Sequence, residues 1–183
     1  TILKSYIPSE KIVNIGWKNT DKFIYSVEKK FDEFLFVLGQ SNFRLVKQIL
    51  EIWKEDYPTL TILSGLKYYE NFNIEKKEQD NIKYIEQYQK AQEYLTLINE
   101  KGVHICLSGC SSFANTLQDC IVSKGVPIAL DCPPFREYIT NNVTGFLVKQ
   151  RKKKKLKNSL GSEFVVDMDE LKSVIERVIN LMK

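Results

Sequence analysis

Two polar turns in this chain have residue types that can bind phosphate. The first spans Gly39–Arg44 and follows an apolar run that predicts a strand over 32–39. The second spans Ser108–Thr116 and follows another apolar run, 103–107. A helix that begins in such a turn presents backbone N–H groups to an anion and needs no charged side chain. Arg44 adds a planar guanidinium, whose forked donors match the oxygens of a phosphate.

Both turns also have a purely structural interpretation. In the first turn, Ser41 or Asn42 can act as the N-cap of the following helix. In the second turn, Ser111–Thr116 can serve only as a cap, and the scarcity of glycine there limits how closely a ligand approaches the backbone. The residue types alone leave the structural and the ligand-binding interpretations open.

Strands and helices are predicted to alternate along the chain. Apolar residues at steps of three and four predict helices over 42–56 and 168–182, with Asp167 as the cap of the second. The other predicted elements are strands over 60–63, 81–86, 126–130 and 145–148, and helices over 87–100, 113–124 and 135–140. Gly102 is expected to end the helix over 87–100. Several strands are apolar throughout, which is typical of a parallel sheet covered on both faces. We therefore expect an open, Rossmann-like α/β sheet of about six strands, which binds ligands beyond the carboxyl ends of its strands.

The composition narrows the class of protein. The 183 residues, 43% of them hydrophobic, fit one globular domain over 1–183, with loops or extensions over 1–10 and 151–166. No apolar run approaches the roughly 18 residues of a membrane span, and the chain opens without a secretory signal pattern. The net charge of +4 is small, and much of it lies in the run Arg151–Lys155, so we expect no nucleic-acid partner.

Cysteine and histidine usage indicates neither a metal site nor a catalytic triad. The four cysteines form no C-x-x-C pair, and with a single histidine we expect no zinc site and reduced thiols in a cytosol-like compartment. That histidine, His104, lies inside an apolar strand, where a packed and hydrogen-bonded ring is expected. Ser111 has no identifiable base, so we expect no serine nucleophile chemistry.

An ordered set of motifs over 104–148 resembles the nucleotide-sugar-binding half of GT-B glycosyltransferases. The segment reads HICLSGCSSFANTLQDCIVSKGVPIALDCPPFREYITNNVTGFLV. The closest match is the retaining glycosyltransferase group 1 (family GT4), typified by glycogen- and sucrose-synthase-like enzymes. That group has an ordered set of motifs: P-S, E-G-F-G, a second Glu, G-x-P-V-I, P-P, E and G-F-L-V. This chain keeps Ser108, Phe113, Gly125, Pro127, Ile128, Pro133, Pro134, Glu137 and Gly145–Val148. Upstream, 34–53 resembles the first strand, glycine turn and helix of the same group, so the resemblance covers roughly 11–182.

The resemblance implies a domain that binds a nucleotide-diphosphate sugar as donor. Enzymes of this kind have two Rossmann-like domains facing a cleft, and this chain matches the C-terminal one. An N-terminal domain or a partner chain would bind the acceptor, and we expect the isolated domain to be inactive. The implied transfer retains the sugar's configuration and needs no obligatory metal cofactor. The departing phosphate takes the acceptor's proton, so no catalytic histidine is required. The implied location is cytoplasmic. Since many such enzymes use lipid-linked acceptors, Arg151–Lys157 is either a solvated loop or a contact with a membrane surface.

The resemblance also assigns roles to individual residues. The family's first glutamate, near the donor sugar, corresponds to Ser111, and its second, which bonds the ribose hydroxyls, corresponds to Asp119. Its basic residues near the diphosphate correspond to Gln40 and Arg44, so Arg44 and Asp119 are the expected catalytic residues. Tyr84 matches the segment that holds the base, with core packing as the alternative. The expected nucleotide-sugar contacts are Gly39, Gln40, Ser41, Arg44, Tyr84, Ser111, Ser112, Phe113, Ala114, Asn115, Thr116 and Asp119.

Departures from the family pattern leave a second function open. The first glutamate is missing, the turn glycines are replaced by Ser112 and Ala114, and one basic residue is replaced by Gln40. A non-catalytic binding or scaffolding domain of glycosyltransferase descent is therefore the alternative to an enzyme domain. An unrelated nucleotide-binding domain is disfavoured, because no G-x-G-x-x-G or G-x-x-x-x-G-K-S/T motif follows any strand. Asp119 itself has a second interpretation, as a solvated helix residue.

Overall fold

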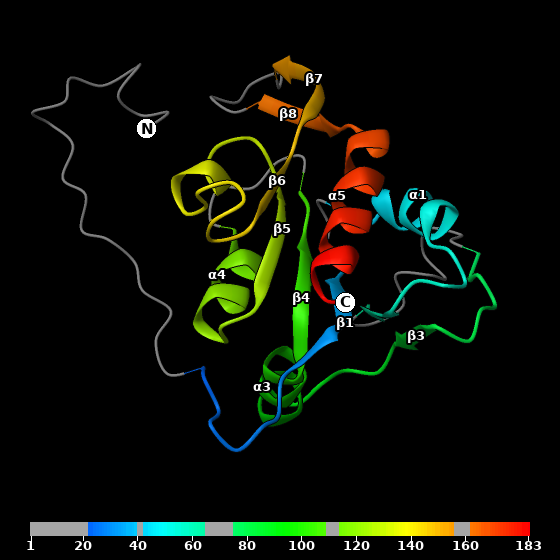
Figure 1. The fold of residues 1–183 in the computed structure, drawn as a ribbon, viewed down its shortest axis with the longest axis vertical. Coiled ribbons are helices and arrows are strands. Elements are labelled where there is room, and N and C mark those ends of the chain that lie inside the picture. Colours follow the sequence, from blue (N-terminus) through cyan, green and yellow to red (C-terminus); the bar gives the residue numbers. More distant parts are fainter. Residues whose placement is uncertain (1–21, 40–41, 65–74, 109–113, 156–161) are drawn as a thin grey trace, which may run out of the picture.

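A parallel sheet of six strands forms the centre of the computed structural model, which describes residues 22–39, 42–64, 75–108, 114–155 and 162–183, with only the backbone for 152–155. The strand order is β3-β2-β1-β4-β5-β6, and every neighbouring pair is parallel. The strands are β1 (Lys30–Val37), β2 (Thr59–Leu63), β3 (Ile82–Ile85), β4 (Lys101–Cys106), β5 (Val126–Leu130) and β6 (Phe146–Val148). This arrangement confirms the open, Rossmann-like α/β sheet predicted from the sequence (Figure 1).

Helices cover both faces of the sheet, as predicted. They are α1 (Leu45–Ile52), α3 (Ala91–Glu100), α4 (Asn115–Val122) and α5 (Met168–Leu181), with the 3-10 turn η3 (Phe135–Glu137). On one face the rings of Phe34 and Trp53 meet edge to face, 5.1 Å apart. On the other face Leu35 packs with Leu97 and Ile98 of α3. Neighbouring residues of β1 thus enter two different cores, which explains an apolar stretch without alternation. Figure 1 shows α4 and α5 on opposite sides of β4 and β5. Within the described ranges, no helix combines the length and apolar character needed to cross a membrane.

The helix after β1 is shorter than the predicted span of 42–56. It ends at Ile52 because Trp53 is extended, with φ −77° and ψ 113°. The ammonium of Lys77 donates hydrogen bonds to the carbonyl oxygens of Leu50 and Trp53 at 3.2 and 2.7 Å. A cation bonded to the last carbonyls of a helix stabilises its C-terminal end, so a residue distant in sequence sets this boundary.

The helix before β4 also differs from its predicted bounds. The predicted span of 87–100 loses its first turn, because Lys90 is extended and its N–H donates to the Glu93 carboxylate at 2.8 Å. Gly102 does not end this helix, contrary to the prediction. The chain passes directly from α3 into extended Lys101, and Gly102 lies inside β4. A change of backbone direction without a separate loop is not visible in the residue pattern.

A two-stranded hairpin stands where the sequence predicted only a loop or an extension over 151–166. β7 (Gln150–Lys155) and β8 (Ser162–Val166) pair antiparallel. The hairpin follows β6 and precedes α5, so it projects beside the carboxyl edge of the main sheet (Figure 1). Asp167 then caps α5 as predicted, since its carboxylate accepts a hydrogen bond from the Glu170 N–H at 3.1 Å.

Candidate functional site

The two predicted turns follow neighbouring parallel strands, so their described ends, Gly39 and Ser108, leave the sheet at its carboxyl edge. β1 and β4 are direct neighbours, with Leu35 opposite His104. The chain leaves β1 toward α1 on one face and leaves β4 toward α4 on the other (Figure 1). The strand order therefore reverses between these two strands, and open α/β sheets bind ligands at such a switch point. Five of the predicted contacts fall outside the described residues, namely Gln40, Ser41, Ser111, Ser112 and Phe113.

Asn42 closes the first turn from inside. Its Oδ1 accepts a hydrogen bond from the Gly39 N–H at 2.7 Å, and its Nδ2 donates to the Val37 carbonyl at 3.0 Å. The N–H groups of Leu45 and Val46 donate to carbonyls of the turn at 2.9 and 3.2 Å. These backbone donors are therefore bonded within the protein, which supports the structural interpretation for Gly39 and Asn42. Asn42 is not the N-cap of α1, contrary to the interpretation from the sequence, because Arg44 occupies that position without a side-chain cap bond. Asn42 instead braces the turn.

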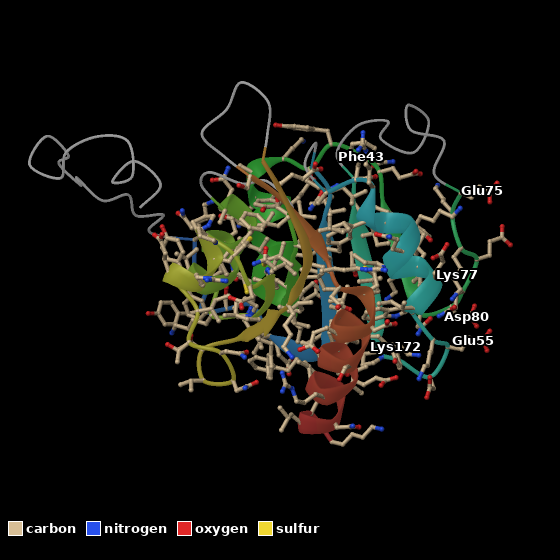
Figure 2. All side chains as sticks on the ribbon, turned by 90° about the horizontal axis from the view of Figure 1, so that it is seen from above. Phe43, Glu55, Glu75, Lys77, Asp80 and Lys172 are labelled. Atoms are coloured by element: carbon tan, nitrogen blue, oxygen red, sulfur yellow. The ribbon has the colours of Figure 1, made fainter. Side chains whose placement is uncertain are left out.

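Arg44 is the only cation in the sequence of the first turn. It is exposed and occupies the N-cap position of α1, with φ −65° and ψ −21°. Its Cζ lies 5.5 Å from the centroid of the Phe43 ring, a cation–π contact that orients the guanidinium. Figure 2 places Phe43 and Lys77 toward opposite ends of α1. An exposed guanidinium at this edge can bind phosphate oxygens through its side chain alone.

Ala114 gives the second turn a glycine-like backbone without a glycine. Its φ of 53° and ψ of 47° lie in the left-handed region, directly before α4. A residue with a Cβ adopts this conformation at a cost of about 1–2 kcal/mol. The Ala114 side chain is buried, and its carbonyl accepts a hydrogen bond from the Gln118 N–H at 3.0 Å. The predicted contacts Asn115 and Thr116 follow in the first turn of α4, where Asn115 is exposed and Thr116 is half-buried.

Asp119 is buried between α4 and α3. Its Oδ1 forms an ion pair with Lys22 Nζ, and its Oδ2 accepts a hydrogen bond of 2.6 Å from the Tyr94 hydroxyl. Burial, followed by the charge of Asp119, raises the pKa of Tyr94, so this hydroxyl stays protonated and donates. The interpretation of Asp119 as a solvated helix residue is therefore wrong, because only 5% of the residue is exposed. Its carboxylate already holds one charged and one neutral donor.

The residue pattern does not single out Lys22 or its anchor, Asn99. Asn99 Nδ2 donates to the Lys22 carbonyl at 2.6 Å, and Asn99 Oδ1 accepts from the Ile24 N–H at 2.9 Å. Lys22 and Asp119 are 97 positions apart, so no local spacing reveals their pairing. Tyr94 carries one signal, a hydroxyl within the apolar register of a predicted amphipathic helix. A buried tyrosine hydroxyl needs a partner, and here the partner is Asp119.

Tyr84 lies apart from both turns, on β3. The strands β2 and β1 separate it from β4. Its hydroxyl accepts from the Lys77 N–H at 2.9 Å and donates to the Lys77 carbonyl at 3.1 Å. The half-buried ring packs against the main core, and burial raises the pKa of the hydroxyl. These contacts support the core-packing alternative, and contact with a base stays a prediction.

His104 and the described cysteines belong to the core. The Nε2 atom of His104 lies 2.9 Å from the Lys101 carbonyl oxygen, and burial lowers the pKa of the ring to about 4. The ring is therefore neutral at pH 7 and donates to that carbonyl, as predicted for a packed histidine. Cys106, Cys120 and Cys132 are buried, and burial raises the pKa of Cys120. Buried thiols with raised pKa values are chemically inert.

Comparison with solved structures identifies proteins that share this fold. A chain of the GtfA/B complex superposes with a TM-score of 0.60 and 15% identity, covering 92% of this chain and 32% of that one. The C-terminal domain of the glycosyl transferase group 1 family protein LpcC from Francisella tularensis superposes with a TM-score of 0.55 and 12% identity, and the match covers 84% of this chain and 77% of that one. The catalytic domain of starch synthase IV from Arabidopsis thaliana, bound to ADP and acarbose, superposes with a TM-score of 0.56 and 14% identity, and the match covers 86% of this chain and 32% of that one. No family model and no curated protein matches the sequence.

The shared feature of these proteins is the Rossmann-like domain. This chain spans about a third of the length of the GtfA/B and starch synthase chains, and most of the isolated LpcC domain. The fold is therefore that of the C-terminal half of a GT-B glycosyltransferase. At identities of 12 to 15%, this likeness establishes the fold and leaves the activity to be argued from the site.

Proposed function

We propose that this chain is the donor-binding domain of a glycosyltransferase that uses a nucleotide-diphosphate sugar and retains the sugar's configuration. The observation that carries the proposal is the adjacency of β1 and β4, the two strands that lead into the predicted turns, at the switch point of the sheet. Arg44 stands in the first turn, and Asp119 stands on the helix that follows the second. Support also comes from the solved proteins of the same fold, which include a starch synthase bound to ADP.

Each part of the edge has a role in this proposal. Arg44 binds the diphosphate and stabilises the charge that develops on it as the sugar departs. The first N–H groups of α4 add to this stabilisation, since the described residues supply no side-chain cap there. Asp119 accepts hydrogen bonds from the ribose hydroxyls. The donor phosphate takes the acceptor's proton, so the buried and neutral His104 has no part in the reaction.

A non-catalytic binding or scaffolding domain is the second candidate, and three observations favour it. The conformation before α4 is strained by the Cβ of Ala114. The Gly39 N–H and its neighbours are bonded within the first turn. Both oxygens of Asp119 already have donors. A site with these features can recognise a nucleotide while holding the sugar too loosely for transfer.

Calorimetric titration of chain 1–183 with UDP-, ADP- and GDP-sugars tests donor binding. We expect Arg44→Ala to weaken binding of the preferred donor by about ten- to a hundredfold, because a charge-assisted hydrogen bond contributes roughly 1.5–3 kcal/mol. Joint replacement of Lys152–Lys155 by Gln is the matched control, since it removes more charge from a segment outside both turns, and it should change binding little. Absence of binding to every donor, or a larger loss in the lysine variant, would contradict the proposal.

Turnover separates the two candidate functions. An acceptor-binding N-terminal domain, joined in cis or added as a partner chain, would complete the cleft. Sugar transfer by that pair, with none by chain 1–183 alone, supports the enzyme domain. Donor binding without transfer or hydrolysis in the completed pair supports the scaffolding domain.

The basic hairpin is the part of the molecule proposed to lie at a membrane, on the cytoplasmic side. β7 carries Arg151 and the lysines that follow it, and it projects beside the same carboxyl edge as the site. Clustered cations are attracted to anionic lipid. In sedimentation with phosphatidylserine vesicles at low salt, the wild-type chain should pellet with the vesicles. The glutamine variant of Lys152–Lys155 should stay in the supernatant. Equal retention of the two proteins would exclude this contact.

A further inference from the structure

Residues 22–29, here called the strap, lie across α3. Hydrogen bonds near both ends of the strap join it to residues about 70 positions later in the sequence. Asn99, which is 1% exposed, bonds the Lys22 carbonyl and the Ile24 N–H at 2.6 and 2.9 Å. At the other end, Lys29 Nζ lies 3.4 Å from each of two carbonyl oxygens where α3 passes into β4. The strap is thus an ordered part of the domain surface, and its backbone is held by a buried side chain.

The strap also reaches α4, the helix that carries Asp119. Beside this helix, the ammonium of Lys124, which follows the end of α4, lies 4.0 Å from the centroid of the Phe23 ring, a cation–π contact. Lys22 pairs with Oδ1 of Asp119, while Tyr94 bonds Oδ2. The Lys22 side chain is 28% exposed and that of Asp119 only 8%. The strap therefore covers the carboxylate from the solvent side.

We propose that Lys22 is a resident competitor of the donor's ribose, and that its ammonium withholds Asp119 from the ligand. This inference rests on the proposed function, which assigns the ribose hydroxyls to Asp119. A ribose offers two neutral hydroxyl donors, whereas Lys22 offers one charged donor to the same carboxylate. Charged donors form the stronger hydrogen bond, so the ammonium outcompetes a ribose hydroxyl for Oδ1 of Asp119.

Lys22 is the partner that can leave, and Tyr94 is the one that stays. The Lys22 side chain is long and partly exposed, so its ammonium can turn into water and keep its hydration. Tyr94 is fixed within α3, and its hydroxyl bonds a different oxygen from the one that Lys22 covers. Departure of Lys22 thus removes the charged donor from Oδ1 while Tyr94 continues to orient the carboxylate.

The proposal predicts an effect opposite in sign to ordinary electrostatics. A nucleoside diphosphate is an anion, so removal of a nearby cation normally weakens its binding. Removal of Lys22 should instead strengthen it, because the carboxylate becomes available to the ribose. A partly exposed ion pair is worth on the order of 1 kcal/mol, so Lys22→Met should tighten binding by about fivefold.

Calorimetry on chain 1–183 tests this with ADP, UDP and GDP and with their 2′,3′-dideoxy analogues. We expect Lys22→Met and Lys22→Gln to tighten binding of the ribose forms by about fivefold and to leave the dideoxy forms unchanged or weaker. Lys22→Arg keeps the pair and should bind as wild type. Lys54→Met is the matched control, because it removes a lysine from another ion pair, with Glu176 at 2.7 Å, and should give no gain.

The outcomes distinguish this inference from the proposed function. If the wild type binds the ribose forms and Lys22→Met binds them equally or more weakly, the competition by Lys22 is refuted and donor binding stands. An equal gain for the dideoxy forms also refutes it, because the gain then does not involve the hydroxyls. If neither the wild type nor the folded Lys22 variants bind any ribose form, both proposals fail together. Circular dichroism melting of each variant shows that it is folded before titration.

Discussion

Gly102 of β4 lies so close to the backbone of Phe31 in β1 that no side chain fits between them. A Cβ at Gly102 would stand 2.6 Å from the Lys30 carbonyl oxygen and 2.8 Å from the Phe31 nitrogen. The register between the two strands shifts in this region, between Lys30 and Phe34. The close approach therefore joins the amino ends of the two strands whose carboxyl ends carry the candidate site.

Replacement of this glycine should destabilise the domain strongly. We expect Gly102→Ala to lower the free energy of unfolding by about 3 kcal/mol, because backbone atoms cannot move aside as a flexible side chain would. Gly39→Ala is the control, since the nearest atom to its added Cβ lies 4.0 Å away, and it should change stability by less than about 1 kcal/mol. Urea unfolding followed by circular dichroism gives both values. Similar losses in the two variants would disprove the close approach.

Tyr94→Phe should destabilise the fold through Asp119. The variant removes the 2.6 Å hydrogen bond and leaves a buried carboxylate with one donor fewer. We expect a loss of about 1–3 kcal/mol in the free energy of unfolding. Tyr88→Phe removes the same hydroxyl from a residue that is 71% exposed and should be neutral. Indistinguishable urea midpoints for the two variants would show that the bond contributes nothing.

Ala114→Gly should stabilise the domain. Glycine adopts the left-handed conformation of residue 114 without steric cost, although it adds freedom to the unfolded chain. We expect a net gain of about 0.5–1 kcal/mol. Ala91→Gly, at the first position of α3, tests the same change in ordinary helical backbone and should destabilise slightly. A lower melting temperature for Ala114→Gly than for the wild type would argue against a left-handed residue in this turn.

The stability of the domain should fall between pH 6.5 and pH 4 because of His104. Burial lowers the pKa of its ring from 6.5 to about 4 in the folded state, so the unfolded chain takes up the proton first. The contribution of the neutral His104 ring to the free energy of unfolding is fully present above pH 6.5. Up to about 3 kcal/mol of it is lost as the pH falls to 4. Chemical unfolding at half-unit pH steps measures this decline.

His104→Gln should flatten that decline, whatever its effect on absolute stability. The chain has a single histidine, so no second imidazole titrates in the same range. Glu100 and Glu176 have pKa values lowered by hydrogen bonds from Lys30 and Lys54, so their contributions disappear at lower pH, below about 4.5. An unchanged slope above pH 5 in His104→Gln would assign the decline to other groups.

The sequence by itself was enough to predict the sheet and the two turns. Apolar runs such as 126–130, which matches β5 residue for residue, carry their strand signal locally. The helical period and Asp167 likewise predicted α5 and its cap, because capping involves residues three apart. Alternation of the two patterns then implied parallel strands, and parallel strands bring their carboxyl ends, with both turns, to one edge.

Only the tertiary structure decided the surroundings of the site. The pairing of Asp119 with Lys22 joins residues 97 positions apart, and neither side chain carries a local sign of the other. The lysine-rich strand β7 forms because it pairs with β8, not because of an apolar pattern of its own. Local propensity depends on a few neighbouring residues, whereas burial and hydrogen-bond partners depend on which distant segments the fold brings together. The ligand site thus stays a prediction from the sequence, and the structure showed that Lys22 and Tyr94 bond the carboxylate of Asp119.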